Sequence, residues 1–290
     1  MKYGDKMHAE QANRRMIVNT IQQKFAGTIL LTLAALGTGR SQNATAELHL
    51  KDIRAQQPQE KLAASTLCKQ AFESPLHGII QRTSVDPNTL VQDLGALMER
   101  SDEVVLTGTP YRSSSVFSPS GESVTTYQNV QVIRSWKGSH NVGDTLTFGV
   151  PAGVVHCGMT DSRQSVYVST MNGTAEWNIA YQGSYLLFLR HPQGKETELV
   201  QTLLPTAGGG LQGMFPISFL NGAPEMNKCA SLRSEALRWC DSFIETSQYP
   251  VIVPYLHDPL GKKYNGMPVA DFLNVVRNLA ADQGLDEKRP

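Results

Sequence analysis

The sequence has few charged residues and no excess of either sign. Only 18% of its 290 residues are charged, and 26 basic residues balance 26 acidic ones. Proteins that bind nucleic acid usually carry a basic patch or stripe, so nucleic acid is not an expected partner. Aromatic residues are also scarce, at 7%, whereas glycine is frequent. This composition is typical of a folded, β-rich protein and argues against a disordered chain.

Long hydrophobic runs are missing except for residues 25–36, FAGTILLTLAAL. Lys24 precedes the run and the small residues Ala44-Thr45-Ala46 follow it, which is the order of a secretory signal peptide. We therefore predict that residues 1–46 are a cleaved signal peptide, with Met16 as an alternative start, and that the protein is periplasmic or extracellular. The alternative is an uncleaved membrane anchor, but a spanning helix requires about 20 apolar residues.

Cysteines are few but even in number: Cys68, Cys157, Cys229 and Cys240. In an exported chain this count predicts disulfide bonds, with three possible connectivities; four separate buried thiols are the alternative. Cys229 and Cys240 lie eleven residues apart, which on one helix is about 16 Å of rise. A disulfide requires Cα atoms within about 7 Å. These two can therefore pair only if the helix begins after Cys229.

Short alternating segments dominate the middle of the chain. Residues 127–136 and 145–150 read as two strands, separated by turn signals at Lys137-Gly138 and Val142-Gly143-Asp144. Further strands are expected at 103–111, 165–170, 184–190, 197–205 and 213–218, and a loop at 113–123. Because crossover helices are missing between most of them, the pattern predicts an antiparallel barrel or sandwich. The alternation places six residues in one core: Val130, Val132, Leu146, Phe148, Leu187 and Leu189.

Helical periodicity appears on both sides of this β region. Leu90, Leu94, Leu97 and Met98 share one helix face. Residues 231–245 and the segment after Pro268 also have helical spacing, with Gly284 ending the second pattern. The Pro-bounded run at 250–256 suits an edge strand or an extended segment. We therefore divide the mature chain into a polar, helical segment (47–100), a barrel (101–218) and a helical extension (219–290).

Four segments stand in a recognisable order: SDEVVLTGTP, VQVIRSWKGSHNVGDTLTFGVPAG, YLLFLR and GGGLQGMFPI. Together with the terminal PVADFLNVVRNLA, they resemble a family of exported bacterial proteins whose small OB-like barrel is related in architecture to the netrin and tissue-inhibitor-of-metalloproteinases modules. The resemblance covers roughly residues 100–218. It implies a mainly β fold, an OB-like antiparallel β-barrel with flanking helices and a C-terminal amphipathic helix.

The resemblance implies a fold and no chemistry, because its motifs consist of turn-forming and core-forming residues. Metalloproteinase inhibitors of this architecture act through an N-terminal cysteine that chelates the protease zinc. Here the predicted mature chain starts at Glu47 and its first cysteine is Cys68, so that mechanism has no counterpart.

Motifs for cofactor, metal or nucleophile chemistry are weak. The glycines of 208–213 match G-x-G-x-x-G, but a dinucleotide site requires a following helix, and Pro216 lies in a predicted strand. His156-Cys157 could join a metal site only with distant partners such as His191 or His257. The serines of 113–123 have no histidine nearby. We therefore predict no catalytic residue, no cofactor and no metal.

Trp136 and Lys137 remain as candidates for a binding face, since OB-like barrels bind ligands across one sheet face and its loops. The alternative, which we favour, is that Trp136 fills the barrel end and Lys137 is a turn residue. The sequence thus predicts an exported, non-catalytic binding or interaction module for an unknown protein or small ligand. One alternative is a protease-inhibitor-like module. Another is a hydrolase whose site is assembled from residues distant in sequence.

Overall fold

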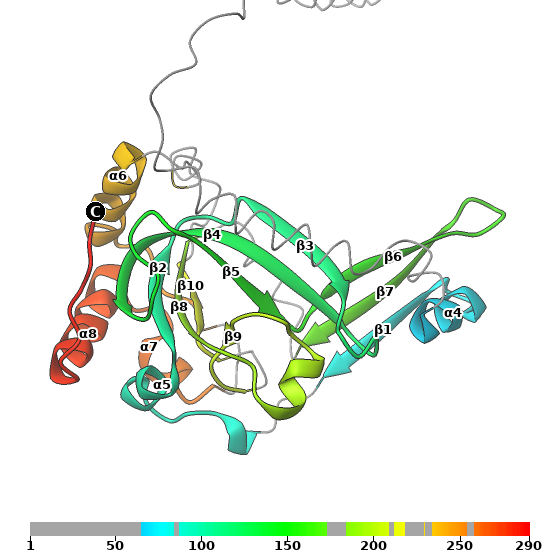
Figure 1. The fold of residues 1–290 in the computed structure, drawn as a ribbon, viewed down its shortest axis with the longest axis horizontal. Coiled ribbons are helices and arrows are strands. Elements are labelled where there is room, and N and C mark those ends of the chain that lie inside the picture. The colour runs from blue at the N-terminus through cyan, green and yellow to red at the C-terminus, as the bar shows by residue number, and fades with distance from the viewer. Residues whose placement is uncertain are drawn as a thin grey trace, which may run out of the picture. The chain divides into compact units, whose positions relative to one another are not determined.

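The computed structural model describes residues 65–83, 87–172, 184–208, 212–217, 229, 234–253 and 258–290. The predicted signal peptide and its cleavage site lie outside this part of the chain. The described residues fold mainly as β structure, in two sheets with several helices (Figure 1). No helix among them is long and apolar enough to span a membrane.

The larger sheet is antiparallel and curls into a half-barrel (Figure 1). Its strand order is β10-β8-β2-β4-β3, with β5 added to β4 and β9 added to β8. The strands are β2 (Glu103–Thr107), β3 (Arg112–Phe117), β4 (Val124–Lys137), β5 (Thr145–Val150), β8 (Tyr185–Arg190), β9 (Leu204–Pro205) and β10 (Met214–Pro216).

Strand β4 is the long element that makes the sheet curl. Its first half pairs with β3 on one edge and β5 on the other, and its second half pairs with β2. The ladder with β2 shifts register between Val104 and Val105 and again between Leu106 and Thr107. Such irregularities bend a strand and increase its twist. At the far side, Leu203 is bridged in parallel to Phe148, and the Gly149 N–H donates to the Leu203 carbonyl (2.8 Å).

The concave side of the curled sheet holds the predicted core. All six predicted residues are fully buried and belong to one cluster, together with Val105, Val150, Tyr185 and Met214. The prediction is confirmed because alternate residues of a strand share a face, and cross-strand pairs such as Val130–Leu146 bring these faces together.

A second core lies between this sheet and a group of helices. The helices are α5 (Leu94–Arg100), α6 (Ser234–Glu245), α7 (Gly261–Tyr264) and α8 (Val269–Asp282). The terminal amphipathic helix is confirmed: Val269, Phe272, Leu273 and Val276 are buried in this core, and Gly284 follows with φ +70°. The tail then returns to the sheet, where Ser135 and Lys288 exchange two main-chain hydrogen bonds.

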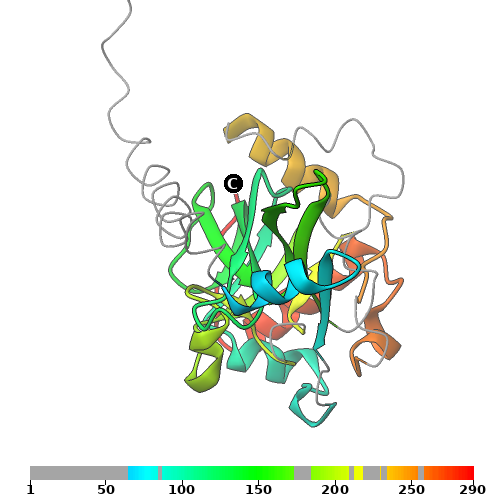
Figure 2. The same cartoon turned by 90° about the vertical axis from the view of Figure 1, so that its right-hand side faces the viewer.

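The smaller sheet has three strands and one covering helix (Figure 2). Its order is β1-β7-β6, and α4 packs on one face; the elements are α4 (Thr66–Glu73), β1 (Gly78–Thr83), β6 (Gly153–Met159) and β7 (Ser165–Asn172). β6 and β7 form an antiparallel hairpin, whereas β1 runs parallel to β7. The predicted antiparallel arrangement holds for the large sheet and for β6 and β7, and the exception is β1, which was not predicted as a strand and reaches β7 from far upstream in the chain.

Three other predicted segments differ from the structure. The strand predicted at 197–205 is wrong: Gly194–Glu198 is a short 3-10 helix, stabilised by a capping box of Gln193 and Glu196, and only Leu204–Pro205 is a strand. The predicted loop at 113–123 begins with strand β3. The helix expected from Leu90 begins at Leu94, because Asp93 caps it through the Ala96 N–H (2.8 Å).

Candidate interaction surface

The four cysteines form two disulfides, Cys68–Cys157 and Cys229–Cys240. The first ties α4 to β6 and so holds the small sheet against its helix. The second joins Cys229 to Cys240 of α6. This bond meets the condition that the helix begins after Cys229, because α6 begins only at Ser234. The two Cα atoms can therefore approach to 5.5 Å. Two disulfides are typical of proteins that mature in an oxidising compartment.

Trp136 and Lys137 have structural contacts. Trp136 is buried in the core between the large sheet and the helices. The Lys137 ammonium donates to the carbonyls of Met98 (3.0 Å) and Glu99 (3.1 Å), at the C-terminal end of α5. A cation at this end stabilises the unpaired carbonyls and the helix dipole. The two residues therefore join β4 to α5. This favours the alternative that they have structural roles and do not form a binding face.

The turn after Lys137 is organised by the buried carboxylate of Glu103. This carboxylate accepts hydrogen bonds from the Ser139 N–H and hydroxyl (both 2.9 Å), and the His140 Nδ1 lies 3.1 Å away. Gly138 has φ +104°, and a Cβ there would collide with the carboxylate. Burial alone would raise the pKa of Glu103, but His140 and Ser139 outweigh it and lower this pKa. The same contact raises the pKa of His140.

The fully buried guanidinium of Arg134 forms the centre of an ion-pair network. It contacts the carboxylates of Asp241, Glu245 (3.1 Å) and Glu287 (3.4 Å). Two further arginines from α8 and the C-terminal tail, Arg277 and Arg289, share these acidic partners. The network has three charges of each sign and joins β4, α6, α8 and the tail. It therefore anchors the helices to the sheet.

Two motifs of the sequence find no chemical role among the described residues. His156 is exposed on β6, and the sulfur of Cys157 is in a disulfide, so it is not available as a metal ligand. The described residues contain no group of three or more metal-ligating side chains, and His257 lies outside them. After Gly213 the chain enters strand β10, where a dinucleotide site would require a helix.

Exposed hydrophobic residues gather in one place. The large hydrophobic side chains that are exposed in the described part of the chain all lie on α4, on the turn that follows it, or on the three strands of the small sheet: Phe72, Leu76, Ile80, Val154, Met159 and Tyr167. Scattered single residues of this kind are ordinary, but a contiguous group marks an interaction surface.

The strand registers place four of these residues on one face of the small sheet. Ile80 pairs with Ser169, and Ser169 with Val154, so these residues form one row across β1, β7 and β6. Tyr167 and Met159 share that face, because cross-strand partners and alternate residues of a strand point the same way. Met159, Ile80, Val154 and Tyr167 are 66%, 56%, 53% and 37% exposed. We call this the open face.

The opposite face of the small sheet is covered. Val155, Val166 and Val168 pack there against Leu67 and Ala71 of α4, with Ile79 beside them. The sheet is therefore apolar on both faces, although α4 occupies only one of them. In an antiparallel sheet beside solvent, the outward face is usually polar. The open face departs from this rule.

Strand β1 also leaves one edge of the sheet unpaired. The Tyr167 N–H donates to the His77 carbonyl (3.3 Å), which fixes the pattern of this parallel ladder. The N–H and C=O groups of Gly78, Ile80 and Arg82 therefore point away from β7, and no hydrogen bond joins them to another described residue. Proteins usually protect such an edge with proline, a bulge or charges. The sequence GIIQRT has only Arg82 for this purpose.

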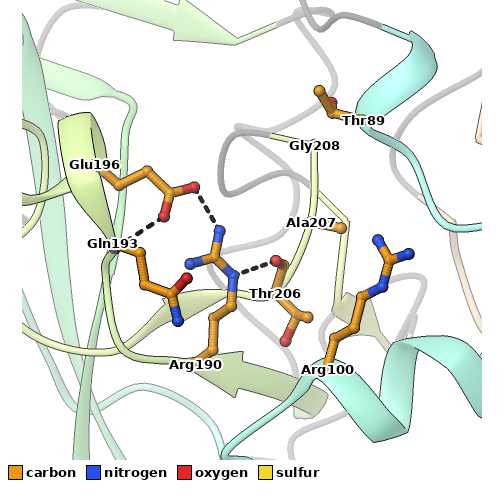
Figure 3. Close-up of a pocket in the computed structure, with 8 residues that line it drawn as sticks. All are labelled: Thr89, Arg100, Arg190, Gln193, Glu196, Thr206, Ala207 and Gly208. Atoms are coloured by element: carbon orange, nitrogen blue, oxygen red, sulfur yellow. Dashed lines mark hydrogen bonds and ion pairs between the residues drawn. The ribbon is translucent and has the colours of Figure 1, made fainter.

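Among the described residues, a pocket of about 530 Å³ is a further feature that could hold a ligand (Figure 3). Arg190 lies in its wall and is paired with Glu196 (2.5 Å) and the Thr206 carbonyl (2.5 Å). Arg100 points into the pocket without an ion pair to any described residue, and offers one positive charge to a small anion. The Thr206 hydroxyl already donates to the Phe188 carbonyl (2.8 Å). A single exposed arginine is a weaker indication of a site than the open face.

Comparison with known protein families, with curated proteins and with solved structures gives no match to this chain. The open face was missed in the sequence because β1 and β6 were not predicted as strands. One signal was present: Ile79-Ile80 and Val154-Val155 are adjacent apolar pairs, each directly preceded by a glycine. Adjacent apolar residues in a strand indicate that both of its faces are apolar.

Proposed function

We propose that this protein is an exported, non-catalytic interaction module that binds an extended segment of a partner protein by strand addition to β1. The observation that carries this proposal is the coincidence of an unpaired sheet edge with an exposed apolar face. Main-chain hydrogen bonds along β1 supply affinity, and apolar side chains at alternate positions of the partner strand cover the open face. The two disulfides support export.

We further propose that the curled sheet is an OB-like barrel that carries this surface. The strand pairs support it, because β2, β4, β5, β9 and β8 follow one another around the sheet. The bridge between Phe148 and Leu203, which brings β5 beside β9 in parallel, closes this circuit. In this interpretation, β3 extends the connection between β2 and β4, and the β6–β7 hairpin is an insertion between β5 and β8, to which β1 is added from upstream of β2.

The contacts of the titratable groups favour binding over hydrolysis. Glu103 and His140 hold a turn, and Glu245 pairs with arginines that anchor the helices. Asp258 is buried, its pKa is raised by that burial, and it accepts hydrogen bonds from the Leu260 N–H and from Gln212. Each of these groups has a role in the fold. The protease-inhibitor-like alternative would use loop tips, such as the projecting β6–β7 hairpin of Figure 1.

The proposal is tested with a random library of linear peptides panned against the intact protein. We expect enrichment of peptides with apolar residues at alternate positions. The variant Ile80→Pro removes one outward N–H while the hydrogen bonds of the β1–β7 ladder remain, since proline is tolerated at a sheet edge. It should lose most of the binding, whereas Leu76→Lys, which removes an exposed apolar residue outside the strands, should retain most of it.

Two outcomes would contradict the proposal. One is that no alternating peptide is enriched, or that Ile80→Pro binds the enriched peptides as tightly as the parent protein does. The other is turnover in a screen of ester, peptide and glycoside substrates that a single change such as Arg100→Gln abolishes. The second result would favour a hydrolase site at the pocket.

A further inference from the structure

The strand that β1 accepts is, we infer, β1 of a second copy of this chain, paired antiparallel about a two-fold axis at Ile80. This inference rests on the proposed function and names its partner. A two-fold interface requires a surface that is complementary to itself. Strand β1 meets this requirement in its main chain, in its side chains and in the position of its covering helix.

The main chain is complementary because the outward residues are spaced by two. Gly78, Ile80 and Arg82 all present their N–H and C=O groups to the open edge. With Ile80 opposite Ile80 of the second copy, Gly78 lies opposite the second copy's Arg82, and Arg82 opposite its Gly78. All three are then hydrogen-bonded pairs that exchange two bonds each, or roughly six main-chain bonds in the interface.

The side chains on the open face are complementary in size and charge. Gly78 has no side chain, and the Tyr167 ring lies over it, so closely that a Cβ there would be 2.9 Å from Cζ. The long side chain of the second copy's Arg82 would arrive beside this glycine and extend toward the Tyr167 ring. Arg82 is exposed, and its side chain forms no hydrogen bond or ion pair with another described residue. A guanidinium over an aromatic ring is an attractive contact, and the two-fold axis creates it twice.

The covered face also admits the second copy. Helix α4 packs over β7 and β1, and neighbouring strands are about 4.8 Å apart. A helix centred between β1 and β7 is therefore about 10 Å from its two-fold copy, which is an ordinary distance between packed helices.

Pairing joins two three-stranded sheets into one of six strands. The central residues of that sheet, Ile80 from each copy, then become neighbours on the open face, and each shields the other from water. Edge strands with few protecting features are prone to this kind of pairing. The register is defined because only Gly78, Ile80 and Arg82 present outward main-chain groups, and a shift by one residue would place the α4-covered face of one copy beside the open face of the other.

The proposed register of the two β1 strands can be tested by cross-linking single-cysteine variants of the intact, oxidised protein. In Ile80→Cys, the two new thiols meet at the axis with Cα atoms about 5.5 Å apart, within the range of a disulfide. In the matched control Arg82→Cys, the two thiols lie on either side of the axis, about 14 Å apart. We expect a covalent dimer from Ile80→Cys under mild oxidation and none from Arg82→Cys.

Light scattering and sedimentation equilibrium measure the same association without a cross-link. We expect the unmodified protein to have twice the mass of one chain, and Ile80→Pro to raise the dimer dissociation constant by roughly tenfold or more, because each copy loses a central N–H donor. Circular dichroism and the melting temperature of Ile80→Pro establish that the variant is folded.

Three results would overturn the inference. They are a monomeric protein at its highest soluble concentration, a dimer that persists in Ile80→Pro, and equal cross-linking of Arg82→Cys and Ile80→Cys. If the protein is monomeric but still binds alternating peptides through β1, strand addition stands and only the identity of the partner is wrong. If the protein neither dimerises nor binds alternating peptides through β1, both proposals fail.

Discussion

Removal of the two disulfides one at a time tests the tertiary arrangement directly, because they close loops of very different length. Cys68 and Cys157 are 89 residues apart, and Cys229 and Cys240 are 11 apart. When loop-closure entropy in the unfolded chain dominates, the first bond contributes about 4.6 kcal/mol and the second about 2.8 kcal/mol. The double variant Cys68→Ala/Cys157→Ala should therefore be less stable than Cys229→Ala/Cys240→Ala by about 1.8 kcal/mol.

The free energy of unfolding is measured by urea titration at neutral pH, with both variants and the parent protein in the same buffer. Treatment of the parent with a reductant is the control, since it should lower the stability below that of either variant. An equal or greater loss in Cys229→Ala/Cys240→Ala would refute the reasoning. It would mean that the buried sulfurs of that pair, and not the length of the closed loop, determine the cost.

Further perturbations address the core of the large sheet, the ion-pair network and the Glu103–His140 pair. Leu187→Ala should lower the free energy of unfolding by about 2–5 kcal/mol in a urea titration, because the side chain is fully buried; a loss below 1 kcal/mol would contradict its place in the core. Arg134→Ala should cost about 3–5 kcal/mol, because it removes the fully buried partner of three carboxylates and leaves them with only Arg277 and Arg289, and Arg134→Met with Asp241→Leu should recover part of that loss. His140→Gln should reduce stability most between about pH 4.5 and pH 6.5, the ordinary pKa values of the two partners. The raised pKa of His140 makes its contribution complete below pH 6.5 and lost as the pH rises through that pKa, whereas the lowered pKa of Glu103 makes its contribution complete above pH 4.5 and lost at lower pH. A stability difference from the parent protein that does not change with pH would contradict the pairing.

The core of the large sheet was predictable because its determinants are local. The alternation in 127–136, 145–150 and 184–190 is a property of each strand alone, and the turn at Lys137-Gly138 separates two of them. The C-terminal helix could also be predicted from local sequence, because its apolar residues recur on one helix face and Gly284 marks its end. The strand predicted at 197–205 did not form over most of its length, because the capping box of Gln193 and Glu196 stabilises a short 3-10 helix at its start.

The open face was beyond prediction because it depends on which distant segments pair. Nothing within GIIQRT indicates that its partner is a strand more than 80 residues away, or that this ladder is parallel. The contacts of Lys137 could not be predicted from local sequence for the same reason. Its sequence neighbourhood suggested a turn, but only the tertiary structure brings the carbonyls of Met98 and Glu99 within reach of its ammonium.

The sequence by itself therefore determined the β character of the protein, the core residues of the large sheet, the terminal helix and the condition under which Cys229 and Cys240 can pair. These features follow from periodicity and chain geometry over a few residues. Only the tertiary structure decided that α4 covers one face of the small sheet and leaves Ile80, Val154, Met159 and Tyr167 exposed on the other. The physical reason is that a strand has two faces and two edges, and its own sequence does not specify what packs against each of them.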